Sequence, residues 1–325
     1  MDNSILIDES LFDEEFIPER LVSREAHVKS IVSSLKSANC GRSKNLFIHG
    51  PPGVGKTLVT RWILKEHFDK NSVYINCWSN RTSHKVIRDI LLKTDTIVHG
   101  KEPTSELVRM LETKQKKVIC LDEFDHLEET DILYDLWKNS HALVMISNTP
   151  YSLAEIDGRI RSRLLLDEVE FKPYGNEEVY NILKERVEYG MRTGAVSEDL
   201  ISIVSKMCNG DARIGLQTLR LAAREAETQN RDTITIEDVK AASKCARKYR
   251  LSYLLGKLNE HQRIIYEILK QNKSMDSGVL FNEYRKLMKE NVTDRSYRNY
   301  MSRMVELELV RVISSGRWKK YEIMM

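Results

Sequence analysis

The stretch of this sequence that most limits its possible folds is FIHGPPGVGKTLVTRW, residues 47–62. It holds the pattern G-x-x-x-x-G-K-[ST] between an apolar run, typical of a buried strand, and an amphipathic run, typical of a helix. Glycines let backbone N–H groups turn toward a chain of phosphates, and the helix N-terminus adds partial positive charge. A strand, such a loop and a helix in this order predict a nucleotide-binding α/β sheet.

We assign the phosphate site to this loop and to the first turn of the following helix. Lys56 is expected to reach the β- and γ-phosphates, and Thr57 to supply a hydroxyl to Mg²⁺. The assigned cofactor-binding residues of this stretch are Gly50, Pro51, Pro52, Gly53, Val54, Gly55, Lys56, Thr57 and Leu58. The expected cofactors are therefore ATP or ADP, with Mg²⁺.

Two adjacent carboxylates, Asp122 and Glu123, follow a second apolar run in KVICLDEFDHLEE. An Asp at the end of a strand is placed to hold Mg²⁺ through water, and a neighbouring Glu is placed to polarise the water that attacks the γ-phosphate. Alone, an acidic pair is a weak signal. About 65 residues after a phosphate loop, it predicts ATP hydrolysis.

Further polar residues fit a site that detects the γ-phosphate. Asn148 ends the apolar run LVMISN, where its amide is placed to orient the attacking water. IDGRIRSRLLL holds Arg159, Arg161 and Arg163. Arg163 is our first choice for stabilising transition-state charge on a neighbour's γ-phosphate, although a solvated basic helix face explains each arginine equally well. Arg213, in NGDARIGLQ, begins another helix and is expected to contact the γ-phosphate from a second domain.

The hydrophobic periodicity divides the chain into three parts. Buried apolar strands alternate with amphipathic helices up to residue 172, which predicts a parallel sheet covered on both faces. Helices then follow one another as far as residue 249. We expect a nucleotide-binding base with an N-terminal adenine-side segment in 1–172, a helical lid in 173–249 and a winged-helix DNA-binding domain in 250–325.

Charge is distributed unevenly, although the net charge of the whole chain is only +3. Residues 246–325 hold 17 Lys and Arg against 9 Asp and Glu, a net of +8, which leaves −5 for the rest of the chain. A basic segment behind an acidic body indicates an anionic partner, and nucleic acid is the first choice. A well-solvated helical surface is the plain alternative.

The basic segment contains a helix and a hairpin that fit DNA. Thr293 is placed to cap the run RSYRNYMSRMVELELV, in which Met301 and Met304 can face a small core while the polar residues fall on the opposite side. The hairpin RVISSGRWKKY would form a wing that meets the minor groove or the backbone. A subdomain that binds only protein is the alternative. The assigned DNA-binding residues are Arg295, Arg298, Asn299, Arg303, Ser315, Gly316, Arg317, Lys319 and Lys320.

Cysteine usage and hydropathy exclude other classes of protein. The five cysteines form no C-x-x-C pair, which argues against a zinc or disulfide framework. No apolar run approaches the roughly 20 residues of a membrane span, and the acidic N-terminus differs from a secretory signal. We therefore expect a cytoplasmic, nucleoid-associated protein with no membrane partner.

Together these motifs resemble those of AAA+ ATPases. Their order resembles that of the archaeal replication initiators, relatives of the origin recognition complex and of the cell-division-control helicase loader. The resemblance covers essentially the whole chain and rests on the phosphate loop, LDE, the SRL box, GDAR followed by LxxLRxA, and PERLVSRE near the N-terminus. It implies that Arg20, Leu21 and Val22 lie near the adenine, and we add Tyr174 to the cofactor-binding residues.

The resemblance implies an ATP-dependent initiator that binds double-stranded origin DNA, recruits or loads an MCM-type replicative helicase and works with other initiator paralogues. Its ATPase would be a slow conformational switch. The family usually has DPR before the arginine box, whereas this chain has Asp157-Gly158-Arg159, which leaves the choice among the three arginines open. The alternatives are a clamp-loader subunit, or a nucleotide-switched regulator of transcription or plasmid copy number.

Overall fold

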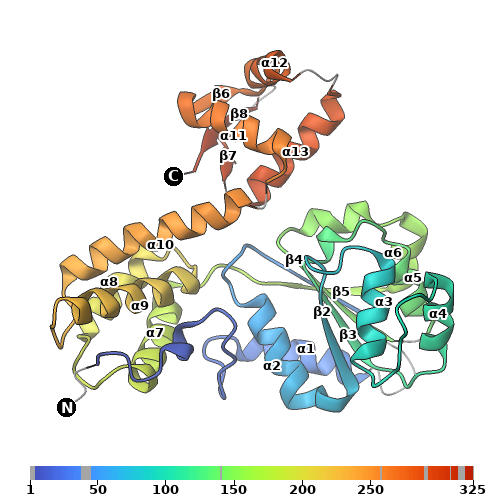
Figure 1. Ribbon diagram of the computed structural model, residues 1–325, viewed down its shortest axis with the longest axis horizontal. Helices are drawn as coiled ribbons and strands as arrows, with labels where there is room; N and C mark the ends of the chain where they lie inside the picture. The colour runs from blue at the N-terminus through green and yellow to red at the C-terminus, as the bar shows by residue number, and fades with distance from the viewer. Residues whose placement is uncertain are drawn as a thin grey trace. The chain divides into compact units, whose positions relative to one another are not determined.

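The computed structural model describes residues 4–37, 45–139, 141–256, 258–288, 292–307, 309–313 and 319–324 (Figure 1). The chain divides into two compact units, Met1–Val239 and Lys240–Met325, each of which is described by itself. Within this division, the limits of base, lid and winged helix at residues 172 and 249 stay predictions.

A parallel five-stranded sheet forms the centre of the first unit, with the strand order β2-β3-β4-β1-β5. All five strands lie where the apolar runs predict them. Because β4 lies between β1 and β3, the carboxyl ends of these three strands are neighbours, which places the phosphate loop near the acidic pair. The strands are β1 (Asn45–His49), β2 (Ser72–Asn76), β3 (Val118–Asp122), β4 (Ala142–Ser147) and β5 (Leu166–Glu170).

Helices cover both faces of this sheet (Figure 1). The helices on one face are α1 (Glu25–Ser37) and α2 (Lys56–Phe68). Those on the other face are α3 (Ser83–Leu92), α4 (Thr104–Glu112), α5 (Ile132–Lys138) and α6 (Gly158–Leu164). Short 3₁₀ segments are η3 (Asp69–Asn71), η4 (Phe124–His126) and η5 (Pro150–Glu155).

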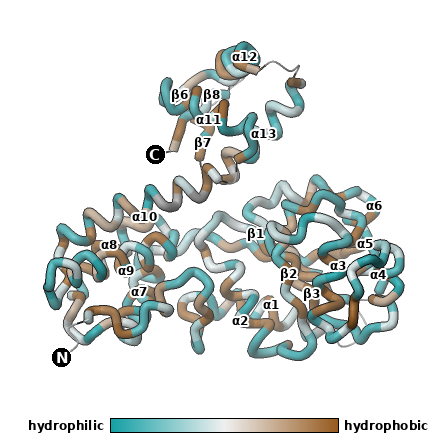
Figure 2. The backbone as a smooth tube through the Cα atoms, viewed as in Figure 1, coloured by the Kyte–Doolittle hydropathy of each residue, from teal (hydrophilic) through white to brown (hydrophobic). Residues whose placement is uncertain are grey.

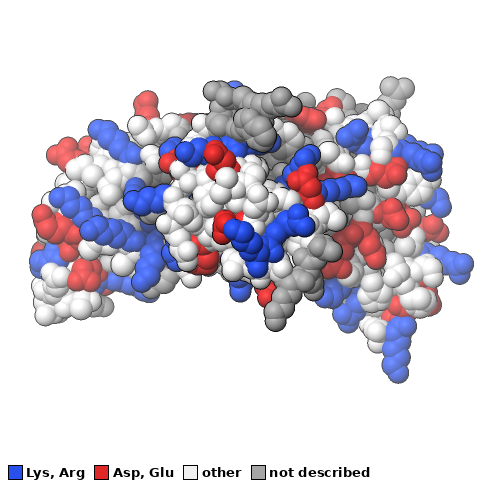
Figure 3. Space-filling view, turned by 90° about the horizontal axis from the view of Figure 1, so that it is seen from above, with Lys and Arg blue, Asp and Glu red and all other residues white. Residues whose placement is uncertain are grey.

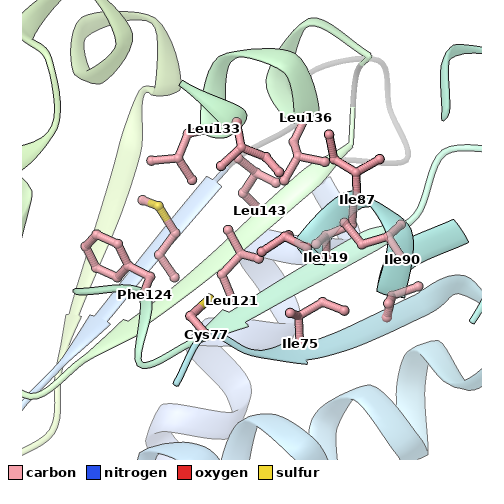
Figure 4. Packing of buried hydrophobic residues seen from close by; sticks show 14 of the residues in the cluster. Ile75, Cys77, Ile87, Ile90, Ile119, Leu121, Phe124, Leu133, Leu136 and Leu143 are labelled. Carbon is pink, nitrogen blue, oxygen red and sulfur yellow. The ribbon is translucent and has the colours of Figure 1, made fainter. Parts of the chain in front are cut away.

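Each face of the sheet has its own apolar cluster, because the inner strands are hydrophobic on both sides (Figure 2). Figure 4 shows one cluster, in which Leu121 of β3 and Leu143 of β4 lie among side chains of the covering helices, including Ile87 of α3 and Leu133 of α5. Burying both faces fixes the strands and therefore the loops at their carboxyl ends.

The lid consists of α7 (Asn176–Gly190), α8 (Glu198–Met207), α9 (Ala212–Thr228) and the start of α10 (Ile236–Gly256). Side chains cap the first turns: Ser197 accepts from the N–H of Leu200, and Asp211 accepts from that of Arg213. The sequence prediction ended the last of these helices at residue 249, which was too short. The run RLSYLLG has neither proline nor glycine before Gly256, so the helix continues to that residue.

The segment 4–16, which we call the N-terminal arm, packs on the lid (Figure 1). Its 3₁₀ segment η1 (Glu9–Phe12) places the fully buried Phe12 against Gly190. Glu227 of α9 accepts hydrogen bonds from the backbone N–H groups of Ile5 (2.6 Å) and Leu6 (3.0 Å). No pattern in the sequence predicts this contact, because the arm is acidic and its partners lie far along the chain.

The second unit has the element order of a winged helix, with a helix, a strand, two helices and a two-stranded hairpin. Its three-stranded antiparallel sheet has the order β6-β8-β7. The short strand β6 is not predicted, because SMD shows no alternation of apolar residues. Its elements are α11 (Glu260–Asn272), β6 (Ser274–Asp276), α12 (Ser277–Leu287), α13 (Asp294–Glu306), β7 (Val310–Val312) and β8 (Lys320–Ile323).

The described residues include neither a membrane-spanning helix nor the tip of the predicted wing. None of their helices is long and apolar enough to cross a bilayer. The predicted tip of the wing, including Ser315, Gly316 and Arg317, lies outside the described residues.

Candidate nucleotide-binding site

The phosphate loop joins β1 to α2 and depends on glycine at two positions. Gly53 and Gly55 have φ values of 83° and 88°, in the left-handed region that favours glycine. A Cβ on Gly53 would lie 2.1 Å from the Asp211 carboxylate, and one on Gly55 would lie 2.5 Å from the Tyr174 hydroxyl. The loop is therefore in close contact with Tyr174, which lies just before the first lid helix, and with Asp211 of the lid.

Lys56 is the buried cation of the site, with only 6% of the residue exposed. Its ammonium donates to the carbonyl oxygens of Gly50 (2.7 Å) and Pro51 (2.8 Å) and to the amide oxygen of Asn148 (3.0 Å). Burial lowers the pKa of Lys56 to about 8, partly against the carboxylate of Asp122, which raises it. A cation held away from water in this way is a favourable partner for phosphate oxygens.

The Asp122 carboxylate is held by donors from three parts of the chain. Its Oδ2 accepts from the hydroxyls of Thr57 (2.8 Å) and Tyr74 (2.7 Å), and its Oδ1 accepts from the backbone N–H of Glu123 (2.9 Å). Burial raises the pKa of Asp122, while the hydroxyl donors act in the opposite direction. Thr57 and Asp122, the two residues predicted to hold Mg²⁺, are therefore in direct contact.

Glu123 has a backbone conformation that is uncommon for a residue with a side chain. Its φ of 52° lies in the left-handed region, at the junction between β3 and η4. Residues held in such conformations often occur at functional sites. The strand order places Glu123 at the same sheet edge as Asn148, as the sequence predicts.

The lid contributes the beginning of α9 to the site. The Arg213 guanidinium lies 3.4 Å from the Asp211 carboxylate and 3.8 Å from Glu14 of the arm. Its charge also lowers the pKa of Lys56, so it lies near the phosphate loop. We did not assign Asp211 to the site, although it belongs to the GDAR motif that led us to Arg213.

Arg24, which we did not assign to the site from the sequence, ties the phosphate loop to the end of the base. Only 5% of the residue is exposed, and its Nη2 donates to the carbonyl oxygens of Val54 (3.2 Å) and Lys172 (2.8 Å). Its guanidinium lies 3.8 Å from the centre of the Tyr174 ring, so Tyr174 lies against the loop. The signal was present, since Arg24 belongs to PERLVSRE.

The predicted adenine-side residues, Arg20, Leu21 and Val22, precede α1. Leu21 packs in the apolar cluster that contains α1 and α2, whereas Arg20 is exposed. The carbonyl oxygen of Glu19 accepts from the Trp62 indole N–H at 3.1 Å. This segment therefore lies along α2, the helix that follows the phosphate loop, and its contact with adenine stays a prediction.

The three candidate arginines of α6 are all exposed. The helix packs through Ile160 and Leu164, which leaves its basic residues outside the core. The Arg163 guanidinium lies 5.2 Å from the centre of the Tyr134 ring of α5. An exposed position fits an arginine that acts on a neighbouring molecule, but it does not select one of the three.

Similarity to known proteins agrees with this geometry. Residues 40–156 match the AAA domain, and residues 180–244 match the Cdc6 AAA+ ATPase-type lid domain. ORC1-type DNA replication protein 1 of Halobacterium salinarum is 30% identical over 311 residues, which cover 91% of this chain and 100% of the relative. This chain belongs to the archaeal ORC1/Cdc6 family. The motif order had led us to the same family, and that prediction is confirmed.

Other ORC1/Cdc6 proteins match over similar lengths. ORC1-type DNA replication protein 9 of H. salinarum is 28% identical over 334 residues, covering 99% of this chain and 94% of the relative. ORC1-type DNA replication protein 1 of Sulfurisphaera tokodaii is 30% identical over 342 residues, covering 94% and 86%. The chain is thus an AAA+ ATPase of a replication initiator family, which does not support the clamp-loader alternative.

Solved ORC1/Cdc6 structures share the fold over nearly the whole chain. The Aeropyrum pernix ORC1 protein in complex with DNA matches with a TM-score of 0.74 at 25% identity, covering 98% of this chain and 93% of that one. Cdc6p from Pyrobaculum aerophilum matches in fold with a TM-score of 0.67 at 21% identity, covering 98% and 94%. The predicted AAA+ base with a helical lid is confirmed.

Proposed function

We propose that this protein binds double-stranded origin DNA through its winged helix and its AAA+ domain and helps to recruit or load an MCM-type replicative helicase. A slow ATPase would switch its conformation, and other initiator paralogues would be partners. The observation that carries this proposal is α13, which follows the nucleotide-binding unit in the same chain and has one buried and one basic face.

The geometry of α13 fits a recognition helix. Tyr297, Met301 and Met304 are buried in the core of the second unit, whereas Arg295 and Arg298 are exposed. The helix N-terminus is fixed by its cap, since the hydroxyl of its N-cap residue accepts from the N–H of Ser296 at 3.2 Å. Helices of this kind place their N-terminal half in the major groove, where arginine can contact bases or phosphates.

The remaining predicted DNA contacts lie on α13 and at the base of the wing. Asn299 and Lys319 are exposed, and Arg303 and Lys320 are half-buried. Lys and Arg are interspersed with Asp and Glu on the face shown in Figure 3. On this face, DNA binding would therefore depend on particular side chains rather than on a continuous basic surface.

The arrangement of residues in the nucleotide site supports the roles in ATP hydrolysis that we predict for them. The hydroxyl of Thr57 and, through water, the carboxylate of Asp122 would hold Mg²⁺, because oxygen ligands of this kind suit that ion. Bound there, Mg²⁺ would neutralise charge on the phosphates. Glu123 would accept the proton of the attacking water, and Lys56 and Arg213 would stabilise charge on the γ-phosphate.

DNA binding is tested by replacing Arg295 and Arg298 with alanine together. In a matched control, Lys270 of α11 and Lys286 of α12 are replaced with alanine, so that the same amount of charge is lost. We expect the α13 variant to lose about tenfold or more in affinity for duplex DNA. The negative slope of log affinity against log salt should become less steep by about 2, because two phosphate contacts disappear. Fluorescence anisotropy at a series of fixed salt concentrations measures both.

Equal losses in the α13 variant and its control would show general electrostatics and count against a recognition helix. Unchanged affinity would exclude α13 as the DNA contact. For the initiator role, mapping of bound DNA in cells should find the protein at one or a few replication start sites. Binding spread over promoters, with Glu123→Gln functional in cells, would instead favour a nucleotide-switched regulator.

A further inference from the structure

Tyr74 lies in the middle of β2, outside every nucleotide-binding motif of the sequence. Its hydroxyl donates at 2.7 Å to Oδ2 of Asp122, which lies at the end of the neighbouring strand β3. A phenol holds its proton at neutral pH, so the Tyr74 hydroxyl is the donor and the Asp122 carboxylate is the acceptor.

Tyr74 complements the other donors to the same carboxylate. Thr57 reaches Oδ2 from α2, and the backbone N–H of Glu123 reaches Oδ1 from the end of β3. Thr57 would also be needed by the metal ion, whereas Tyr74 holds Oδ2 from β2 and has no other predicted task. Both oxygens of the carboxylate are thus held by donors, which come from α2, β2 and the end of β3.

The Tyr74 ring is itself held in place. The guanidinium of Arg61 lies 5.5 Å from the ring centre, and Arg61 follows Thr57 by one turn of α2. The backbone of Tyr74 is fixed as well, since its carbonyl oxygen accepts from the ammonium of Lys93 at 2.8 Å. The hydroxyl is therefore positioned by packing before any ligand binds.

We propose that Tyr74 is a positioning residue for the Mg²⁺–nucleotide complex and acts by fixing the orientation of the Asp122 carboxylate. This inference rests on the proposed Mg²⁺ site. Side chains that orient a metal-binding group in this way typically change metal affinity by 10–100-fold when they are removed. Tyr74→Phe removes only the hydroxyl and keeps the packing of the ring.

The test measures binding of a fluorescent ATP analogue as Mg²⁺ is added, in a Glu123→Gln background that blocks hydrolysis. Tyr74→Phe should leave nucleotide affinity in EDTA unchanged and raise the Mg²⁺ concentration for half-maximal enhancement of binding by about tenfold. The control Tyr297→Phe removes another buried hydroxyl, which donates to the carbonyl oxygen of Ser277 at 3.2 Å in the second unit. It should leave the Mg²⁺ dependence unchanged.

Thermal unfolding separates positioning from packing. A Tyr74→Phe protein that melts earlier but keeps the Mg²⁺ dependence of its parent would overturn the proposal, because Tyr74 would then act only in the fold. If Tyr74→Phe fails to fold, Arg61→Ala, which frees the ring, should give a smaller rise in the same Mg²⁺ requirement, and no rise would also overturn it. A parent protein with no Mg²⁺ dependence would instead contradict the proposed metal site.

Discussion

Lys56 carries a charge and is nevertheless buried, which is rare for a lysine. It is predictable from sequence because its role follows from a short local pattern. Arg24 belongs to the motif PERLVSRE, but its contacts, like those of Tyr74, come from other parts of the chain and follow from no local pattern. Arg24 donates to carbonyl oxygens 30 and 148 residues away, and Tyr74 to a carboxylate 48 residues away.

The lowered pKa of Lys56 predicts a pH dependence of nucleotide binding. Bound phosphates would stabilise the charged ammonium, so its pKa is higher in the complex than the value of about 8 in the free protein. ATP affinity should therefore be at its plateau below about pH 8 and fall as the pH rises above that value. Titration of a fluorescent ATP analogue across this range measures it.

Lys56→Arg is the control for this dependence, because a guanidinium stays charged throughout the range. Its affinity is expected to be lower but nearly independent of pH. An equal fall in both proteins would assign the pH effect to another group.

At the scale of elements, α10 begins with a reciprocal cap. Both carboxylate oxygens of Asp238 accept from the Arg231 guanidinium at 2.7 Å, and Oδ2 also accepts from the N–H and hydroxyl of Thr235 at 2.8 Å. The run TITIEDV places Thr235 at N-cap spacing, but it gives no sign of the salt bridge, because Arg231 lies in the preceding loop. The bond to Arg231, with those to Thr235, lowers the pKa of Asp238 to about 2.

Asp238→Asn should therefore destabilise the lid by about 2 kcal/mol at neutral pH, since each pKa unit corresponds to 1.36 kcal/mol. The depressed pKa means that this stability is present above the unfolded value of 3.8 and is lost as the pH falls through about 2. Denaturant unfolding at pH 7 and at lower pH measures the difference. The exposed neighbour Glu237→Gln is the control, and an equal effect there would contradict the assignment.

The sequence did not predict how the N-terminal arm packs on the lid. Phe12 is 1% exposed and packs on Gly190, whereas Ile7 in the same arm is 68% exposed. Phe12→Ala should cost about 3–5 kcal/mol of unfolding free energy, and Ile7→Ala should cost far less. Denaturant unfolding of the two variants provides the comparison. Similar costs would mean that the arm does not rest on the lid through Phe12.

At the scale of the whole molecule, the prediction from sequence succeeded because local patterns appear in a fixed order. Strand, loop and helix periodicities located every strand of the parallel sheet, since burial on both faces imposes continuous apolar runs. The strand β6 and the contacts of the N-terminal arm escaped, because they are stabilised by distant partners and not by their own composition.

The joint construction of the nucleotide site from base and lid predicts a difference between nucleotides. Arg213→Ala should weaken ATP binding about tenfold or more and leave ADP binding nearly unchanged, because a charged hydrogen bond to the γ-phosphate contributes about 1.5–3 kcal/mol. Parallel titrations with ATP and ADP analogues measure the ratio. Arg220→Ala, whose guanidinium donates to Asp13 at 2.6 Å, is the control and should keep the ratio. A proportional loss for both nucleotides in Arg213→Ala would contradict a γ-phosphate contact.

The arm has a mechanical consequence for the lid. The chain enters the lid covalently after Lys172, and the arm grips it a second time through Leu6, which pairs with Met191, and through Phe12. The lid is therefore held at two places, and both connections restrict its movement relative to the base while the arm stays bound. A wider movement of the lid would require the arm to detach. The amide of Ile7, which donates to the carbonyl oxygen of Gly190, would then exchange its hydrogen with solvent.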